Sequence, residues 1–202
     1  ARRFTLVKSE LRDGINQIYT MNADGSGQTH LSNNGLSDIF PAWSPDGTQL
    51  AFTSTRDGNH EIYLMNANGS GQTRLTNNVG YDTTPAWSPD GKFIAYAVLT
   101  FGGAGYLTNS VWVVPAQGGE PLKIREGGFP SWTPDSRRVL FHSDRAPYRV
   151  LSVALDAPQE EPTVFFANPA SLYPAISPDG SRIAFGERGI EIFDTKTGQL
   201  LA

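Results

Sequence analysis

One short phrase occurs four times in this chain and constrains its architecture more than any other feature. It reads Pro-Ala-Trp-Ser-Pro-Asp-Gly from Pro41 and from Pro85, and it returns in altered form from Pro130 and Pro174. The intervals between these copies are 44, 45 and 44 residues, read directly from the numbering. A period of this size is typical of arrays built from one supersecondary unit. The chain is therefore expected to repeat a single structural element.

The second repeat reads as four short strands separated by turns. Pro41 can open a strand although it cannot donate a hydrogen bond within one. Ser44-Pro45-Asp46-Gly47 has the residue preferences of a type I turn, so a hairpin is expected there. Alternating apolar residues then predict a second strand around 50–53, a third over 61–65 and a fourth over 73–76.

Four short antiparallel strands per unit, without helical periodicity, predict the blade of a β-propeller. We expect an all-β fold in which residues 1–202 form one domain of about five four-stranded antiparallel blades. Nothing before Phe4 resembles the repeated phrase, so the first blade is expected to lack its inner strand. That open edge would invite strand pairing with a neighbouring chain. The expected blade boundaries are about 1–34, 35–78, 79–125, 126–168 and 169–202.

Composition excludes several classes of partner and site. The formal net charge is −4, with 16 Lys and Arg against 20 Asp and Glu, which argues against a nucleic-acid partner. The chain has no cysteine, so disulfides and thiolate metal sites are excluded. The most apolar stretch, 93–107, is interrupted by polar residues and glycines, so no membrane insertion is expected.

The run from Pro41 to Asn78 resembles the repeat of TolB-type β-propellers, and the resemblance extends over essentially the whole chain. It implies a non-catalytic scaffold that binds a protein or peptide through its loop face and central funnel, in the periplasm or outside the cell. The same resemblance leaves open an accessory, gating domain of a peptidase or hydrolase, a metal-dependent sugar-acid lyase, or a structural subunit of a larger assembly.

One face of the predicted disc carries the connections between blades and those between second and third strands. Loops held by a rigid scaffold are common places for binding residues. Phe40, Phe129 and Tyr173 precede a blade-opening proline, and Phe101 and Tyr106 lie in a long glycine-rich connection. The predicted partner-binding residues are Asp38, Phe40, Arg56, Asp57, Asp82, Phe101, Tyr106, Phe129, Arg145 and Tyr173. The alternative is structural: the aromatics cap the core, and each arginine pairs with an aspartate of an adjacent blade.

Catalytic and metal sites find little support in the sequence. His30, His60 and His142 fall at different places in the repeat, so no shared set of ligands is expected. The segment 22–27 loosely fits the start of a calcium loop, but it carries one carboxylate only and is better explained as a hairpin turn. We expect no catalytic residue, no metal site and no cofactor.

Overall fold

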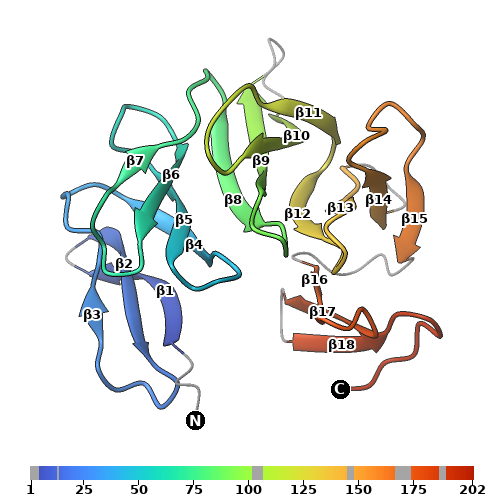
Figure 1. The fold of residues 1–202 in the computed structure, drawn as a ribbon, viewed down its shortest axis with the longest axis horizontal. Coiled ribbons are helices and arrows are strands. Elements are labelled where there is room, and N and C mark those ends of the chain that lie inside the picture. The colour runs from blue at the N-terminus through green and yellow to red at the C-terminus, as the bar shows by residue number, and fades with distance from the viewer. Residues whose placement is uncertain (1–4, 13, 102–106, 145–147, 167–173, 187–189) are drawn as a thin grey trace. The chain divides into compact units, whose positions relative to one another are not determined.

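The structure is a computed structural model, and it describes residues 5–12, 14–101, 107–144, 148–166, 174–186 and 190–202. Within these ranges the chain forms 18 strands and no helix, which confirms the all-β prediction (Figure 1). Accordingly, the described part of the chain contains no helix that could cross a membrane.

The strands form five antiparallel sheets, and in each sheet the strands follow one another in chain order. This meander is the topology expected of propeller blades, so the sheets are called blades 1 to 5 in chain order. The chain divides into two compact units, Ala1–Pro85 and Ala86–Ala202, which are described separately.

The first unit contains blades 1 and 2 and the start of β8. The strands of blades 1 and 2 are β1 (Thr5–Arg12), β2 (Ile15–Asn22) and β3 (Thr29–His30), then β4 (Asp38–Trp43), β5 (Gln49–Ser54), β6 (Glu61–Asn66) and β7 (Thr73–Arg74). Their shared apolar cluster is made of Ile18, Leu31, Leu50, Phe52, Tyr63 and Met65, with Val7 and Trp43 packed against it. Blade 1 has three strands, and β1 takes the place that β5 takes in blade 2.

The second unit contains blades 4 and 5 and most of blade 3. Blade 3 comprises β8 (Tyr81–Trp87), β9 (Phe93–Phe101), β10 (Leu107–Pro115) and β11 (Leu122–Glu126). Blade 4 comprises β12 (Gly128–Trp132), β13 (Arg138–His142), β14 (Val150–Ala154) and β15 (Thr163–Phe166). Blade 5 comprises β16 (Ala175–Ile176), β17 (Arg182–Gly186) and β18 (Ile190–Asp194), and an isolated bridge between Phe193 and Leu200 stands where a fourth strand would be.

The repeated Ser-Pro-Asp-Gly phrase forms the predicted turn. The amide of Gly47 donates to the carbonyl of Ser44 at 2.9 Å, and Gly180 donates to Ser177 at 2.8 Å. The aspartate of each turn serves the turn itself: Asp46 Oδ1 accepts from the Ser44 hydroxyl at 2.6 Å and from the Thr48 amide at 3.0 Å. These bonds explain the recurrence of aspartate in the phrase.

The tryptophan of the phrase in blade 4 packs against the preceding blade. Trp132 is 3% exposed, and its indole Nε1 donates to the carbonyl of Ala86 in the inner strand of the preceding blade at 3.0 Å. Its ring stacks on Phe93 with 6.4 Å between ring centroids. The phrase therefore fixes the joint between successive blades as well as the turn.

Strand lengths differ from the sequence-based expectation at both ends of the blade. Inner strands begin before the proline, so β4 starts at Asp38 and not at Pro41. The fourth strand of blade 2 is shorter than the predicted 73–76, because β7 ends at Arg74.

The residue before the blade-opening proline is left-handed in three blades. Phe40, Thr84 and Phe129 each have φ 52°. A residue before proline normally adopts an extended conformation, and left-handed residues other than glycine are uncommon. In blades 2 and 4 the conformation coincides with a β-bulge, between Ile39 and Ala42 and between Gly128 and Ser131. The bulge reorients the start of the inner strand, where several predicted site residues lie.

Candidate functional site

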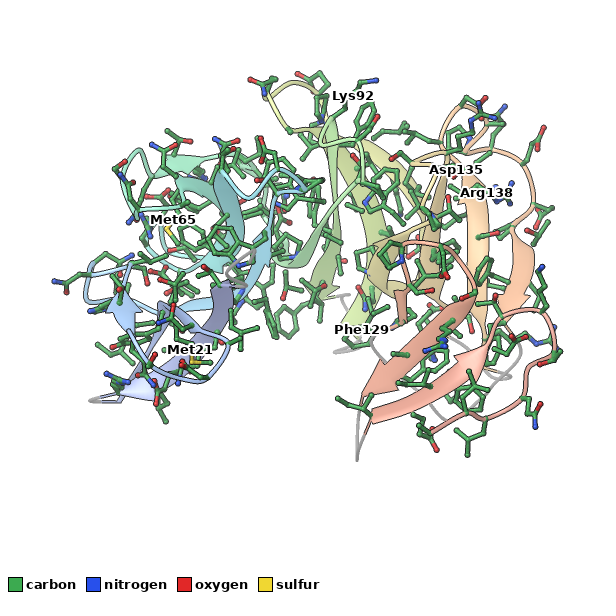
Figure 2. The ribbon with its side chains drawn as sticks, turned by 60° about the horizontal axis from the view of Figure 1, so that its bottom comes forward. Met21, Met65, Lys92, Phe129, Asp135 and Arg138 are labelled. Carbon is green, nitrogen blue, oxygen red and sulfur yellow. The ribbon has the colours of Figure 1, made fainter. Side chains whose placement is uncertain are left out.

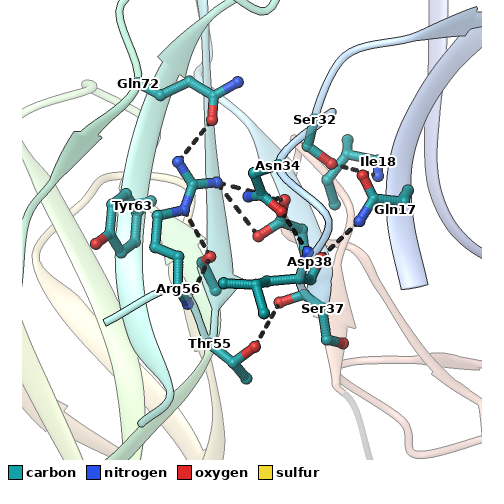
Figure 3. A network of polar contacts seen from close by, with 12 residues as sticks. Gln17, Ile18, Ser32, Asn34, Ser37, Asp38, Thr55, Arg56, Tyr63 and Gln72 are labelled. Carbon is teal, nitrogen blue, oxygen red and sulfur yellow. Dashed lines mark hydrogen bonds and ion pairs between the residues drawn. The ribbon is translucent and has the colours of Figure 1, made fainter. Parts of the chain in front are cut away.

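The loop end of blade 2 holds a buried ion pair between two predicted site residues (Figure 3). Asp38 starts β4 and is fully buried, and Arg56 follows the end of β5. Their closest atoms, Arg56 Nη2 and Asp38 Oδ1, lie 3.3 Å apart. The register that places Asp38 opposite Ser54 brings the two side chains together within one sheet. Asn34 Nδ2 donates to the same carboxylate at 2.8 Å.

The guanidinium of Arg56 is held on every side. Its Nε donates to Ser54 Oγ at 2.8 Å and its Nη1 to Gln72 Oε1 at 2.7 Å. Its carbon Cζ lies 4.4 Å from the ring centroid of Tyr63, within cation–π range. The Arg56 side chain is 17% exposed, so its planar face is fixed close to the surface.

Asp57 connects this pair to a second group of polar residues. Its carboxylate accepts a hydrogen bond from the Tyr63 hydroxyl and lies 3.3 Å from Arg74 Nη1. Burial, followed by the contact with Asp57, raises the pKa of Tyr63 to about 12. Asp57 is 40% exposed, so it is the member of the network most accessible to a partner.

The second group surrounds the fully buried Glu61 at the start of β6. Arg74 Nη2 donates to Glu61 Oε1 at 2.7 Å, and the Thr76 hydroxyl donates to Oε2 at 2.8 Å. The amide of Asn78 donates to the same Oε1 at 3.1 Å. A buried carboxylate is costly unless it is paired and hydrogen-bonded, and Glu61 has three such partners.

Asp82, in β8, is a second buried carboxylate beside Glu61. Both of its oxygens accept from Asn78 Nδ2, at 2.9 and 2.8 Å. Burial raises the pKa of Asp82 to about 7, and the neighbouring charge of Glu61 acts in the same direction. Two carboxylates in one buried place hold a proton more tightly than either would alone. Asp82 is therefore a proton-binding group near neutral pH.

The connections between blades in the first unit are held by these networks. Asn59 Nδ2 donates to the carbonyls of Asn78 and Gly80, at 2.9 Å each. The preceding connection is held by Gln17, whose Nε2 donates to the Leu36 carbonyl at 2.5 Å. The ring of His60 lies 5.2 Å from that of Tyr81, and burial lowers the pKa of His60.

Exposed apolar side chains stand on these two connections and at the start of the strands that follow them, β4 and β8. Leu36 is 44% exposed, Phe40 40%, Val79 98% and Tyr81 38%. Each lies within four residues of Asp38 or Asp82 in the sequence. The first unit thus presents apolar side chains from loops whose backbones are fixed by buried polar groups.

The second unit carries the other described residues of the prediction. Phe129 is the second residue of β12 and lies at the end of this strand opposite to the turn that contains Asp135 (Figure 2). Phe101 ends β9 and is 64% exposed. At the turn end of this unit, the repeated phrases of blades 3, 4 and 5 enclose a pocket of about 390 Å³. Its walls include Trp87, Trp132 and Ile176.

The structure brings some of the predicted residues together and leaves others apart. Asp38, Arg56, Asp57 and Asp82 belong to one polar network of the first unit, and Phe40 lies beside it. The network connects them through Tyr63, Arg74 and Glu61 and their hydrogen bonds. Three predicted residues, Tyr106, Arg145 and Tyr173, lie outside the described residues. The structural alternative predicted that each arginine pairs with an aspartate of an adjacent blade. Arg56 does pair with an aspartate, but Asp38 belongs to the same blade.

Sequence reasoning missed Glu61, Thr76 and Asn78. A signal was available, because Asn34 and Asp38 recur as Asn78 and Asp82 at the same spacing of four residues. Both pairs form the same side-chain hydrogen bond. Among the described residues, no group of three or more His, Asp and Glu is arranged to hold a metal ion.

Comparison with known proteins agrees with this fold. The model of the TolB beta propeller domain family matches residues 4–102 and 26–128, which together span more than half of the chain. The chain therefore belongs to the TolB β-propeller family. No curated protein sequence matches it.

Solved structures show the same fold. TolB from Acinetobacter baumannii is similar with a TM-score of 0.78 and 20% identity, over 92% of this chain and 48% of that one. A putative TolB from Agrobacterium tumefaciens has a TM-score of 0.77 and 18% identity, over 100% of this chain and 80% of that one. A puromycin-hydrolyzing peptidase of Mycobacterium tuberculosis has a TM-score of 0.71 and 18% identity, over 100% of this chain and 35% of that one.

These likenesses show that the five sheets are blades of a β-propeller. The chain spans about half the length of the Acinetobacter baumannii TolB chain. At these identities the solved structures define the fold and leave the activity open.

Proposed function

We propose that residues 1–202 act as a non-catalytic binding scaffold, which takes up a protein or peptide at the loop end of blades 1 and 2. The observation that carries the proposal is the pairing of exposed apolar side chains with a rigid support. Leu36 and Val79 stand on connections between blades, and Phe40 stands in β4 just after the first of them. These connections are hydrogen-bonded through Gln17, Asn34 and Asn78.

Such an arrangement favours binding for a physical reason. Ordering a loop during association costs conformational entropy, and a loop that is already fixed avoids that cost. Apolar side chains then contribute by leaving water, while Asp57 and Arg74 at the edge offer charges of both signs. A peptide with apolar residues beside one charged residue fits this surface best.

The buried residues have a positioning role in this proposal. Asp38 and Asp82 are fully buried and cannot touch a partner without rearrangement. Arg56 is held by Asp38 and presents little surface. The exposed residues of the connections, and not the charged residues beneath them, are therefore expected to determine affinity.

A peptide library displayed on phage and selected against residues 1–202 tests the proposal. The affinity of a selected peptide is measured by calorimetry with the parent protein and with Val79→Ser. We expect the affinity to fall at least about fivefold, since a buried apolar side chain contributes 1 kcal/mol or more. Val164→Ser is the matched control, because Val164 is 49% exposed on β15. Equal affinities for all three proteins would refute the loop-end site.

The membership of the TolB family supports an exported location, and we propose the periplasm or the cell exterior. Fractionation of cells that produce the natural full-length protein tests this part. Recovery from the cytoplasmic fraction alone would contradict it.

A further inference from the structure

The two connections between blades in the first unit correspond to one another in the repeat. The first connection, 31–37, follows β3, and the second connection, 75–80, follows β7. Equivalent positions lie 44 residues apart, which is the interval between the first two copies of the repeated phrase. The charges around the two connections can therefore be compared position by position. In each, an asparagine donates to a buried aspartate four residues later, Asn34 to Asp38 and Asn78 to Asp82.

Around the first connection, the buried carboxylate has a cation of its own. Arg56 Nη2 lies 3.3 Å from Asp38 Oδ1 (Figure 3). The supporting side chain in β2 is the neutral amide of Gln17, which donates to the carbonyl of Leu36. One carboxylate and one guanidinium leave this buried group without net charge.

Around the second connection, both of these supporting residues are replaced. The position of Arg56 is taken by Thr100, which carries no charge, and the position of Gln17 is taken by Glu61. Glu61 is 0% exposed, as is Asp82. The second connection therefore lies against two buried carboxylates, where the first lies against one.

The nearby cation does not compensate both carboxylates. Arg74 Nη2 lies 2.7 Å from Glu61 Oε1, and Nη1 of the same residue lies 3.3 Å from the carboxylate of Asp57. Among the described residues, no ion pair includes Asp82. Its two oxygens accept from the uncharged side chain of Asn78. In its charged form Asp82 is therefore a buried carboxylate without a counter-ion, which is costly.

A proton on Asp82 removes that excess charge. Burial, with the charge of Glu61 acting in the same direction, raises the pKa of Asp82 to about 7. Burial lowers the pKa of His60, which therefore holds its proton less tightly than Asp82, and the pKa of Tyr63 is about 12. The strand β9, which pairs with β8, holds no charged residue. The other titratable or charged groups on the neighbouring elements are Asp57, Arg74, Tyr81 and Tyr96.

We propose that Asp82 and Glu61 form a proton-dependent switch, which holds the second connection in place when Asp82 is protonated and lets it move away from β6 when Asp82 is charged. The connection carries Val79, which is 98% exposed. Val79 belongs to the surface that the proposed function assigns to a partner, so the effect of the switch on binding rests on that function. The effect on the connection itself does not.

Asn78 is the residue through which the switch acts. Its amide donates to Glu61 Oε1 at 3.1 Å, its side chain donates to Asp82, and its Oδ1 accepts from the Gly80 amide at 2.7 Å. When the connection moves away, Asp82 reaches water and its pKa returns toward the ordinary value of 3.8. Opening therefore releases a proton between about pH 4 and pH 7, and each pH unit in this window favours the open connection about tenfold.

Hydrogen exchange of residues 1–202, followed by NMR without any peptide, tests the switch. The protection of the amides of Asn78, Gly80 and Asp82 is corrected for the intrinsic dependence of exchange on pH. It should fall about tenfold per pH unit from about pH 5 to about pH 7 and level off above that. The Leu36 amide, which donates to Asn34 Oδ1 in the first connection, is the internal control and should keep its protection.

Two variants assign the effect to Asp82. Asp82→Asn carries no charge and keeps an oxygen for Asn78, so the protection should remain and should no longer depend on pH. Asp144→Asn, at an exposed position, changes the net charge equally and should behave as the parent protein does. Amides of β5, which lies between β4 and β6, report global unfolding and should stay better protected than the second connection at each pH.

Peptide binding tests the consequence for the partner. The affinity of a peptide selected at the loop end is measured by calorimetry at about pH 5.5 and about pH 7.5. It should fall in proportion to the closed population that hydrogen exchange measures, and Asp82→Asn should show no such fall. If no peptide is selected, the proposed function fails, and the exchange data still decide whether the switch exists.

Three results would overturn the proposal. The first is unchanged protection of the second connection between about pH 5 and pH 7. The second is the same dependence on pH in Asp82→Asn, which would assign the titration to another group. The third is an equal loss of protection in the first connection or in β5, which would show that the whole unit responds to pH and not this switch.

Discussion

Arg56 and Asp38 stand 18 residues apart in the sequence and form a buried ion pair, with Nη2 and Oδ1 separated by 3.3 Å. The pair joins the inner strand of blade 2 to the end of the second strand. A buried pair of this kind destabilises the fold strongly when one partner is removed, because the other charge remains without compensation.

Arg56→Ala is therefore expected to lower the free energy of unfolding by about 3 kcal/mol. Urea denaturation followed by circular dichroism measures the change. Arg12→Ala is the matched control: Arg12 occupies the same place in blade 1, is 44% exposed and pairs with Glu10 at the surface. It should cost about 1 kcal/mol or less. Similar losses in the two variants would contradict the role of Asp38.

Asp82 predicts a dependence of stability on pH. Its pKa in the fold is about 7, above the ordinary value of 3.8, so folding favours the protonated form. The stabilisation is complete below about pH 4 and is lost as the pH rises to about 7. Unfolding experiments across this range should show the stability falling with pH, against the usual trend for a paired carboxylate.

Asp82→Asn should remove this slope and raise stability at pH 8, since the amide carries no charge and keeps an oxygen for Asn78. Asp144→Asn, a change at an exposed position, controls for the change in net charge. An unaltered slope in Asp82→Asn would show that another group titrates.

The position of Gly127 has no room for a side chain. Its φ is 142°, and an added Cβ would lie 2.6 Å from the carbonyl oxygen of His142 and 2.7 Å from the Phe141 ring. Gly127→Ala should cost about 2 kcal/mol or more, through backbone strain and the clash with β13. Gly186→Ala, where nothing lies within 4 Å, should be close to neutral. Thermal unfolding of both variants decides the comparison.

The tryptophans of the repeated phrase should differ in their response to one substitution. Trp132→Phe removes the donor to Ala86 and leaves that carbonyl without its partner, so a loss of about 1–2 kcal/mol is expected. Trp43→Phe should cost less, because its Nε1 has no acceptor among the described residues. Equal losses in chemical denaturation would contradict this contrast.

The blades could be predicted because their signals are local. The Ser-Pro-Asp-Gly turn, the alternating strands and the constant period each fix structure over a few residues, and the structure confirms them at Gly47 and Gly180. The sequence predicted that Arg56 could pair with an aspartate, but it did not predict which aspartate. The location of this ion pair depends on the bulge between Ile39 and Ala42, which brings Asp38 to the end of β5 and leaves no mark in the residue pattern.

The sequence did not predict that the carboxylates of Glu61 and Asp82 lie close together. They meet because the connection from Thr76 to Gly80 folds back on β6, with Asn59 and Asn78 as its supports. No residue type in that connection predicts this path by itself. The partner-binding role of the predicted residues stays a prediction.

The Arg56 network has a consequence for how such chains evolve. The residues that contact Arg56, Asp38 and Asp57, from Asn34 to Arg74, all come from a stretch shorter than one period of the repeat. A duplication of one period therefore copies the Arg56–Asp38 pair together with the side chains that hydrogen-bond to it. A gene segment of this length can be gained or lost without leaving Arg56 or Asp38 buried and unpaired. The number of blades can therefore change during evolution without breaking this ion pair.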